Sequence, residues 1–139
     1  EKTREMEWRD AEGNLWLKTG DIGVIDADGF VSIVGRAKDM IISGGFNIYP
    51  VDLEAVLLEE PEVAEAAVVG VPSEQWGETP VGFIVAQAGL DVDAAAVLAS
   101  VNSKLGKTQR LSALHLIEEM PRSHIGKLLK TELRERLGA

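Results

Sequence analysis

The sequence predicts a small α+β domain, in which helices pack on a short sheet, preceded by a β-hairpin segment. From Pro50 onward the patterns follow the order helix, strand, strand, helix, strand, helix. Before Pro50, β-branched runs flank glycine-containing turns, which is typical of hairpins. The 139 residues are 45% hydrophobic, so there is room for one packed domain, or for one domain and a piece of another.

Two hairpins are predicted within the first fifty residues. Residues 1–18 are polar and mixed and define no core. In the first, Val24-Ile25 pairs with residues 30–34 around the turn at Asp28-Gly29. In the second, residues 40–42 pair with residues 46–49 around Ser43-Gly44-Gly45. The second set is equally consistent with a loop whose backbone comes close to another group, because glycine permits such an approach.

Three helices are predicted from apolar stripes at helical spacing. The first begins at Pro50, buries Leu53, Val56 and Leu57, and ends at Glu60-Pro61. The second is capped by Asp93 and buries Ala94, Val97, Leu98, Val101 and Leu105. The third spans residues 128–137, with Leu129, Leu133 and Leu137 on one face and Lys130, Glu132, Arg134 and Glu135 on the others.

Three strands complete the expected domain. The apolar run 66–71 predicts a strand covered on both faces. Residues 81–85 are its expected partner, joined to it by a loop over residues 72–80. Residues 114–117 form the last strand.

Composition excludes several kinds of function. The net charge is −9 and no lysine or arginine cluster interrupts it, which argues against a nucleic acid or an anionic membrane as partner. The absence of cysteine excludes disulfides, thiol catalysis and thiolate metal sites, and the two histidines support no metal site. No apolar run reaches membrane-spanning length, so we expect a soluble, cytoplasmic protein. The start at Glu1, which opens no recognisable element, indicates a fragment.

The stretch Pro121-Arg122-Ser123-His124-Ile125-Gly126-Lys127 is the main candidate for chemistry. Its proline and glycine predict a mobile loop, pinned at its far end by the terminal helix. Such a loop can carry the Lys127 ammonium into a site, where it acts as a point donor to phosphate or carboxylate oxygens. The alternative is a solvated lysine at the start of a surface helix.

Asp21 and Arg36 are the other polar candidates. A carboxylate can accept hydrogen bonds from vicinal hydroxyls, as those of ribose, and a guanidinium can bind phosphate. A turn-forming aspartate and a surface arginine are the alternatives. No Ser-His-Asp set, paired glycosidase-like carboxylates or complete phosphate loop can be assembled. The residues by themselves therefore indicate a nucleotide- or acid-binding fragment.

Taken together, the motifs resemble the adenylate-forming superfamily, and within it most of all an AMP-forming acyl-CoA synthetase. They are Lys18-Thr19-Gly20-Asp21, Asp28-Gly29, the run from Gly35 to Pro50, Gly70-Val71-Pro72, Gly77-Glu78 and Pro121 with Gly126-Lys127. They span nearly the whole chain in the order and spacing of that family. The resemblance implies that residues 1–36 are the last segment of a large N-terminal domain and that residues 37–139 are the C-terminal lid domain.

The resemblance also implies roles for particular residues. Asp21 corresponds to the acidic residue that binds the ATP ribose, with Arg36 at the same nucleotide, and Lys38 corresponds to the hinge about which the lid swings. Lys127 corresponds to the lysine that contacts the acid's carboxylate and the α-phosphate during adenylation. Ser43, Gly44 and Gly45 would help to form the pantetheine channel.

The implied substrates are ATP with Mg²⁺, a carboxylic or fatty acid, and CoA. The metal would be bound mainly through ATP and the missing domain, and the fragment alone would be inactive. One departure concerns CoA, because many relatives have a Lys-x-Pro step where this chain has Gln109-Arg110-Leu111, which leaves Lys107 as the nearby cation. Two alternatives remain at this point: an adenylation domain that delivers to a carrier protein or an oxidative step, and a non-catalytic interaction domain.

Overall fold

A computed structural model describes residues 5–138, which form two compact units divided between Lys38 and Asp39. The first unit consists of two antiparallel hairpins, β1 (Glu7–Arg9) with β2 (Leu15–Leu17) and β3 (Asp21–Ile25) with β4 (Val31–Arg36). None of the residues 5–38 is buried. The boundary expected after Arg36 precedes this division by two residues.

The sequence patterns predict the β3–β4 hairpin but not the β1–β2 hairpin, whose strands are three residues long. A polar turn holds the shorter hairpin together. The Asp10 carboxylate accepts hydrogen bonds from Trp16 Nε1 at 2.8 Å and from Asn14 Nδ2 at 3.0 Å. These two bonds lower the pKa of Asp10, because they favour its charged form.

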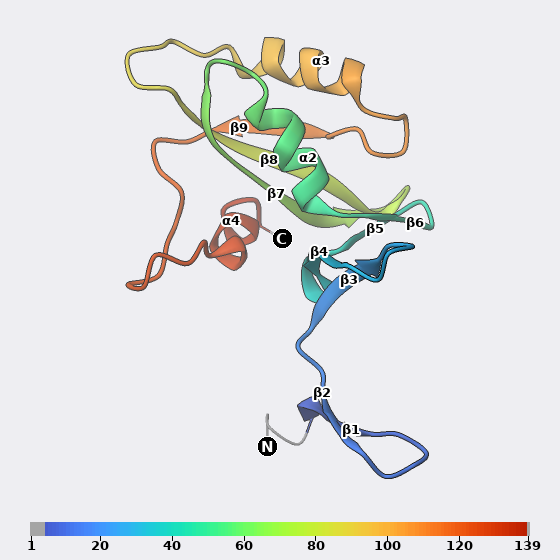
Figure 1. The fold of residues 1–139 in the computed structure, drawn as a ribbon. Helices are drawn as coiled ribbons and strands as arrows, with labels where there is room; N and C mark the ends of the chain where they lie inside the picture. The colour runs from blue at the N-terminus through green and yellow to red at the C-terminus, as the bar shows by residue number, and fades with distance from the viewer. Residues whose placement is uncertain (1–4, 139) are drawn as a thin grey trace. The chain divides into compact units, whose positions relative to one another are not determined.

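The second unit is built on a mixed sheet of five strands (Figure 1). The strands are β5 (Ile41–Ser43), β6 (Phe46–Ile48), β7 (Val63–Ser73), β8 (Gly77–Ala86) and β9 (Ala113–Leu116). The central strand is β8, which pairs antiparallel with β7 along its length. Its other side pairs with β5 at Gly77 and, in parallel, with β9 from Val81 to Ile84. Strand β7 therefore forms one edge of the sheet.

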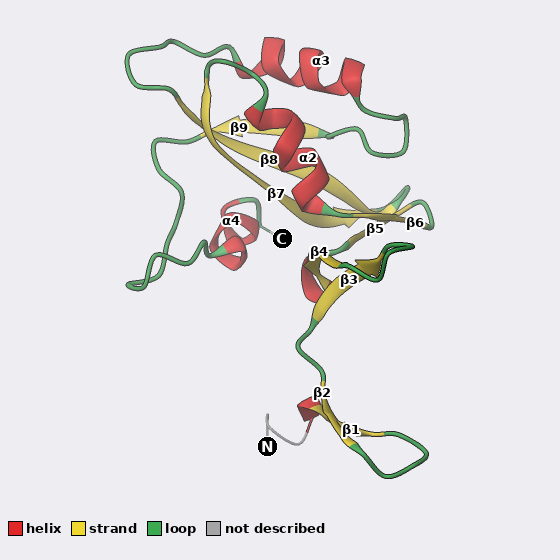
Figure 2. Cartoon of the chain, in the orientation of Figure 1, coloured by secondary structure: helices red, strands yellow, loops and turns green. Residues whose placement is uncertain are grey.

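Helices cover both faces of this sheet (Figure 2). On one face, α2 (Pro50–Leu58) and α3 (Ala94–Lys104) bury Leu53, Leu57, Val97 and Val101 against strand residues that include Val68. On the other face, α4 (Lys130–Arg136) buries Leu133 against a cluster with Val69 and Phe83. The α+β class, with helices packed on a small sheet after a hairpin segment, is confirmed.

Two expected boundaries are wrong. Residues 72–80 were expected to form a loop, but β7 and β8 extend through most of them and leave a turn of three residues between Ser73 and Gly77. Pro80 is tolerated in β8 because it lies between the pairing with β5 and the pairing with β9, where no partner needs its N–H. The terminal helix begins at Lys130 rather than at Leu128, because Leu128 forms a β-bridge with Arg122.

Candidate functional site

The segment that carries Lys127 folds as a small hairpin between the sheet and α4. Besides the Arg122–Leu128 bridge, the Ser123 N–H donates to the Lys127 carbonyl at 2.8 Å, and the Gly126 N–H donates to the Ser123 carbonyl at 2.8 Å. Gly126 has φ of +81°, which favours glycine at that turn. We call residues 121–129 the Lys127 hairpin.

Both ends of the Lys127 hairpin are attached to the sheet, whereas the sequence predicts attachment only at the far end. At the first end, Arg122 forms an ion pair with Glu65 of β7 and donates to the Gly126 carbonyl at 3.1 Å. At the second end, Lys130 Nζ lies 2.6 Å from Glu54 Oε1 of α2 and 3.1 Å from the Val68 carbonyl oxygen of β7.

The Lys127 side chain is exposed at the end of this attached hairpin. Within residues 5–138, no ion pair or side-chain hydrogen bond engages its ammonium group. A cation on a long stem with no protein partner is available to an anionic ligand.

Asp21 and Arg36 come together, as the sequence suggests for two residues at one rim. They are register partners on β3 and β4, and Arg36 Nε lies 3.0 Å from Asp21 Oδ1. The carboxylate keeps its second oxygen for another donor. Lys38 follows them in the exposed 3₁₀ turn η1 (Ala37–Asp39), as the last residue of the first unit.

The turn Ser43-Gly44-Gly45 joins β5 to β6 and is held against the β7–β8 turn. The Gly44 N–H donates to the Trp76 carbonyl at 2.8 Å, and the Ile42 N–H donates to Glu78 Oε2 at 2.8 Å. Gly44 has φ of +56°, and a Cβ added there would lie 3.0 Å from the Trp76 ring. Glycine is therefore favoured at this position, both by the backbone φ and by the nearness of the Trp76 ring.

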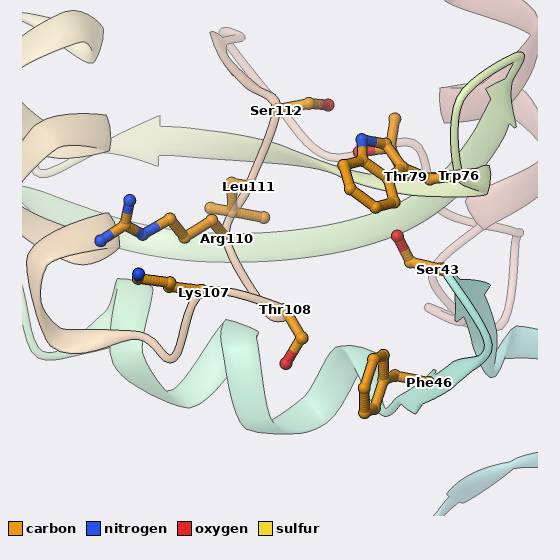
Figure 3. Close-up of a pocket in the computed structure, with 10 residues that line it drawn as sticks. Ser43, Phe46, Trp76, Thr79, Lys107, Thr108, Arg110, Leu111 and Ser112 are labelled. Carbon is orange, nitrogen blue, oxygen red and sulfur yellow. The ribbon is translucent and has the colours of Figure 1, made fainter.

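A pocket of about 370 Å³ opens beside this turn. It is lined by Ser43, Gly44, Phe46, Trp76, Thr79, Lys107, Thr108, Arg110, Leu111 and Ser112. Figure 3 shows the cationic side chains of Lys107 and Arg110 on one side and the rings of Trp76 and Phe46 on the other. A ligand with an anionic group and a flat ring suits such a lining.

Known proteins are similar to this chain in both sequence and fold. The family model described as the AMP-binding enzyme C-terminal domain matches residues 52–127, and its match ends at Lys127. The chain belongs to this family. Its recognition as the C-terminal domain of an adenylate-forming enzyme is confirmed.

The relatives of this AMP-binding enzyme C-terminal domain are much longer proteins. The chain is 44% identical to 2-succinylbenzoate–CoA ligase of Geobacillus kaustophilus over 86% of its own length, but over only 24% of that protein. It thus spans about a quarter of the length of the curated relatives it matches.

Solved structures resemble the chain as well. ATP-bound MatB from Rhodopseudomonas palustris has a TM-score of 0.84 and 37% identity, over 98% of this chain and 26% of that one. The o-succinylbenzoate CoA synthetase from Bacillus subtilis, in complex with an acyl-adenylate intermediate, has a TM-score of 0.78 and 39% identity, over 86% and 24%.

The structure adds residues that the sequence reasoning missed. Trp76 and Arg110 line the pocket together with Ser43 and Gly44, but the sequence assigns no role to Trp76 or Arg110 and indicates only Lys107 as the nearby cation. Lys130 was assigned to a solvent-facing side of its helix but is only 17% exposed. No sequence signal marks its partner Glu54, because the two are 76 residues apart.

Metal and membrane features are not found in the described part of this AMP-binding enzyme domain. Among residues 5–138, no three His, Cys, Asp or Glu side chains gather closely enough to hold a metal ion. Nor do these residues include a helix with the length and apolar character needed to span a membrane.

Proposed function

We propose that this chain is the C-terminal part of an AMP-forming acyl-CoA synthetase. The whole enzyme would activate a carboxylic or fatty acid with ATP and transfer the acyl group to CoA. The observation that carries this proposal is the 44% identity to a quarter of a CoA ligase. The likeness to the structures of MatB with bound ATP and of o-succinylbenzoate CoA synthetase with an acyl-adenylate supports it further.

In the first half-reaction, a carboxylate oxygen of the acid attacks the α-phosphorus of ATP, and the bond to the β-phosphate breaks to release pyrophosphate. Two anions must approach each other in this step. We assign to Lys127 the role of donating to both of them, which offsets their repulsion and stabilises charge in the transition state. Its lack of any protein partner within the described residues supports this role.

Asp21 and Arg36 are proposed to hold the nucleotide. The free oxygen of Asp21 would accept from the ribose hydroxyls, while the Arg36 ion pair at 3.0 Å fixes the orientation of the carboxylate. Mg²⁺ would accompany ATP, but the described residues do not fit a metal site of their own, so no step is assigned to the metal here.

In the second half-reaction, the CoA sulfur attacks the acyl carbon and the bond to AMP breaks. We propose that the domain turns about Lys38 between the two steps, which withdraws Lys127 and brings the turn Ser43-Gly44-Gly45 to the acyl-adenylate. Because Gly44 and Gly45 have no side chains, the pantetheine arm could pass close to their backbone.

The pocket beside that turn is the proposed seat of the nucleotide end of CoA. Lys107 and Arg110 would bind its phosphates, and Trp76 offers a ring face to its adenine. Arg110 therefore supplies a cation in the segment where the relatives' Lys-x-Pro step is missing. This pocket favours free CoA over a carrier protein, whose phosphopantetheine has no adenosine.

The test uses the full-length enzyme that contains this chain. ATP–pyrophosphate exchange and CoA-thioester formation are measured across a panel of carboxylic acids. We expect both activities with at least one acid, and a K107A/R110A double variant should raise the KM for CoA about tenfold or more without changing exchange.

The matched control is Arg136→Ala, which removes an exposed cation of α4 outside the pocket and should change neither activity. If the enzyme showed no ATP–pyrophosphate exchange with any acid, the non-catalytic interaction domain would become the favoured alternative. Exchange without any CoA thioester would instead favour transfer to a carrier protein. The cytoplasmic location and the inactivity of the fragment alone stay predictions.

A further inference from the structure

The second end of the Lys127 hairpin is attached to α2 and β7 through an ion pair that is largely removed from water. The Lys130 and Glu54 side chains are only 17% and 19% exposed, and both have long, flexible stems. Taking two charges largely out of water costs free energy, which the attraction between them often only offsets. A pair of apolar side chains could join the same elements as stably, so stability alone does not explain why charges occupy this place.

The position of the pair explains what the charges do. Val68 lies on β7, an edge strand of the sheet, and both partners contact its backbone. Its N–H donates to Glu54 Oε1 at 2.9 Å, and its carbonyl accepts from Lys130 Nζ at 3.1 Å. Because the backbone of a strand is fixed by its ladder, these two bonds give the ion pair a defined place and direction that an apolar contact would lack.

The pair also joins the two faces of the sheet. Glu54 belongs to α2 on one face, and Lys130 is the first residue of α4 on the other. Lys130 follows the end of the Lys127 hairpin directly, and the Leu129 N–H donates to the Pro121 carbonyl at 2.9 Å, which closes the base of that hairpin. The Lys130 side chain is therefore one of the contacts that hold the second end of the Lys127 hairpin on the sheet.

We propose that Lys130 is a positioning residue for adenylation, which orients the Lys127 hairpin through Glu54 and the Val68 backbone. The inference rests on the proposed function. Lys130 touches no substrate and acts only through Lys127. Its loss should therefore slow the half-reaction that needs Lys127 and spare the one that does not.

The test compares three variants of the full-length enzyme. Lys130→Met keeps the apolar stem but removes the charge, Lys130→Arg keeps the charge, and Lys104→Met is the matched control. Among the described residues, Lys104 also forms a lysine–glutamate ion pair, with Nζ 2.9 Å from Oε1 of Glu60, which follows the end of α2; Lys104 lies on α3, on the opposite face from α4.

We expect Lys130→Met to reduce pyrophosphate exchange about tenfold or more, since small misplacements of a catalytic group have effects of that size. Conversion of pre-made acyl-adenylate to the CoA thioester should change less than about twofold. Lys130→Arg should restore most of the exchange activity. Lys104→Met should leave both half-reactions unchanged, even where it lowers the thermal midpoint.

A second measurement does not depend on turnover. Amide hydrogen exchange of peptides covering residues 121–129 should become faster in Lys130→Met and stay unchanged in Lys104→Met. The positioning role alone would be overturned if Lys130→Met slowed both half-reactions equally. It would also be overturned if this variant changed neither pyrophosphate exchange nor the amide protection of residues 121–129. A wild-type enzyme without pyrophosphate exchange would overturn the proposed function and this inference with it.

Discussion

Lys127 and Lys130 lie three residues apart, yet their ammonium groups differ in exposure and in the number of protein partners. Lys127 is exposed, and within the described residues no ion pair or side-chain hydrogen bond engages its ammonium group. Lys130 is mostly buried, with a carboxylate at 2.6 Å and a backbone carbonyl at 3.1 Å. On the roles proposed for the two lysines, the difference teaches that a cation kept for a ligand is left without a protein partner, while its neighbours fix the backbone beneath it.

The most direct test of this difference is the removal of the Lys127 side chain. Lys127→Ala should lower pyrophosphate exchange by about a hundred- to a thousandfold, the usual cost of removing one group that stabilises transition-state charge. The thermal midpoint should stay the same, because the side chain makes no contact that folding requires. Exchange kinetics and a thermal melt of the full-length enzyme check the two parts. Unchanged exchange would contradict the role of the hairpin.

Leu133→Ala tests the apolar part of the attachment. Leu133 is fully buried on α4, and its truncation should cost about 2–5 kcal/mol of stability, because the site cannot collapse around the lost atoms. A denaturant melt measures the loss. Leu129→Ala is a milder control, since that residue is only partly buried. Equal losses in the two variants would mean that α4 is not anchored by Leu133.

Gly126→Ala changes the backbone of the Lys127 hairpin without touching either lysine. A Cβ would meet nothing within 4 Å, but φ of +81° is strained for alanine by about 1 kcal/mol. We expect slower pyrophosphate exchange with little change in thermal midpoint. Gly13→Ala, at φ of +87° in the β1–β2 hairpin and also with open space, is the control that should not affect exchange. A loss of the same size in both would show that strain as such is responsible.

The smallest expected effect is on the pH dependence of stability, and it involves the ion pair between Lys104 and Glu60. The hydrogen bond from Lys104, and then that from Ser100, lower the pKa of Glu60. A carboxyl group whose pKa is lower in the folded protein contributes stability that is complete above its unfolded pKa. That stability is lost as the pH falls below about 4 and through the folded value. Thermal midpoints measured between pH 3 and 7 should therefore fall less steeply in Lys104→Met than in the wild type. Parallel curves would contradict the assignment.

The sequence predicts the core of this domain because its signals are local. The stripe of Leu53 and Leu57 and the Asp93 cap, which accepts from the Ala95 and Ala96 N–H groups, each lie within one helix. The turn glycines at positions 44 and 45 are equally visible, because φ above zero leaves few other choices.

What the sequence misses depends on distant partners. Nothing near Lys130 indicates that it meets Glu54, and nothing near Trp76 indicates that it shares a pocket with Arg110. The β1–β2 hairpin is missed for another reason, because it is held by the polar turn at Asp10 and buries no stripe. Local periodicity cannot report either kind of contact.

The arrangement of β8 has a consequence for how the domain folds. Strands β7 and β8 are joined by a three-residue turn and pair at ten register positions, so this hairpin closes with little loss of chain entropy. Strand β9 returns to β8 only after the whole of α3 has been traversed, and α4 docks later still along the chain. We therefore expect the domain to fold from β7–β8 outward, with the Lys127 hairpin as its last part to form.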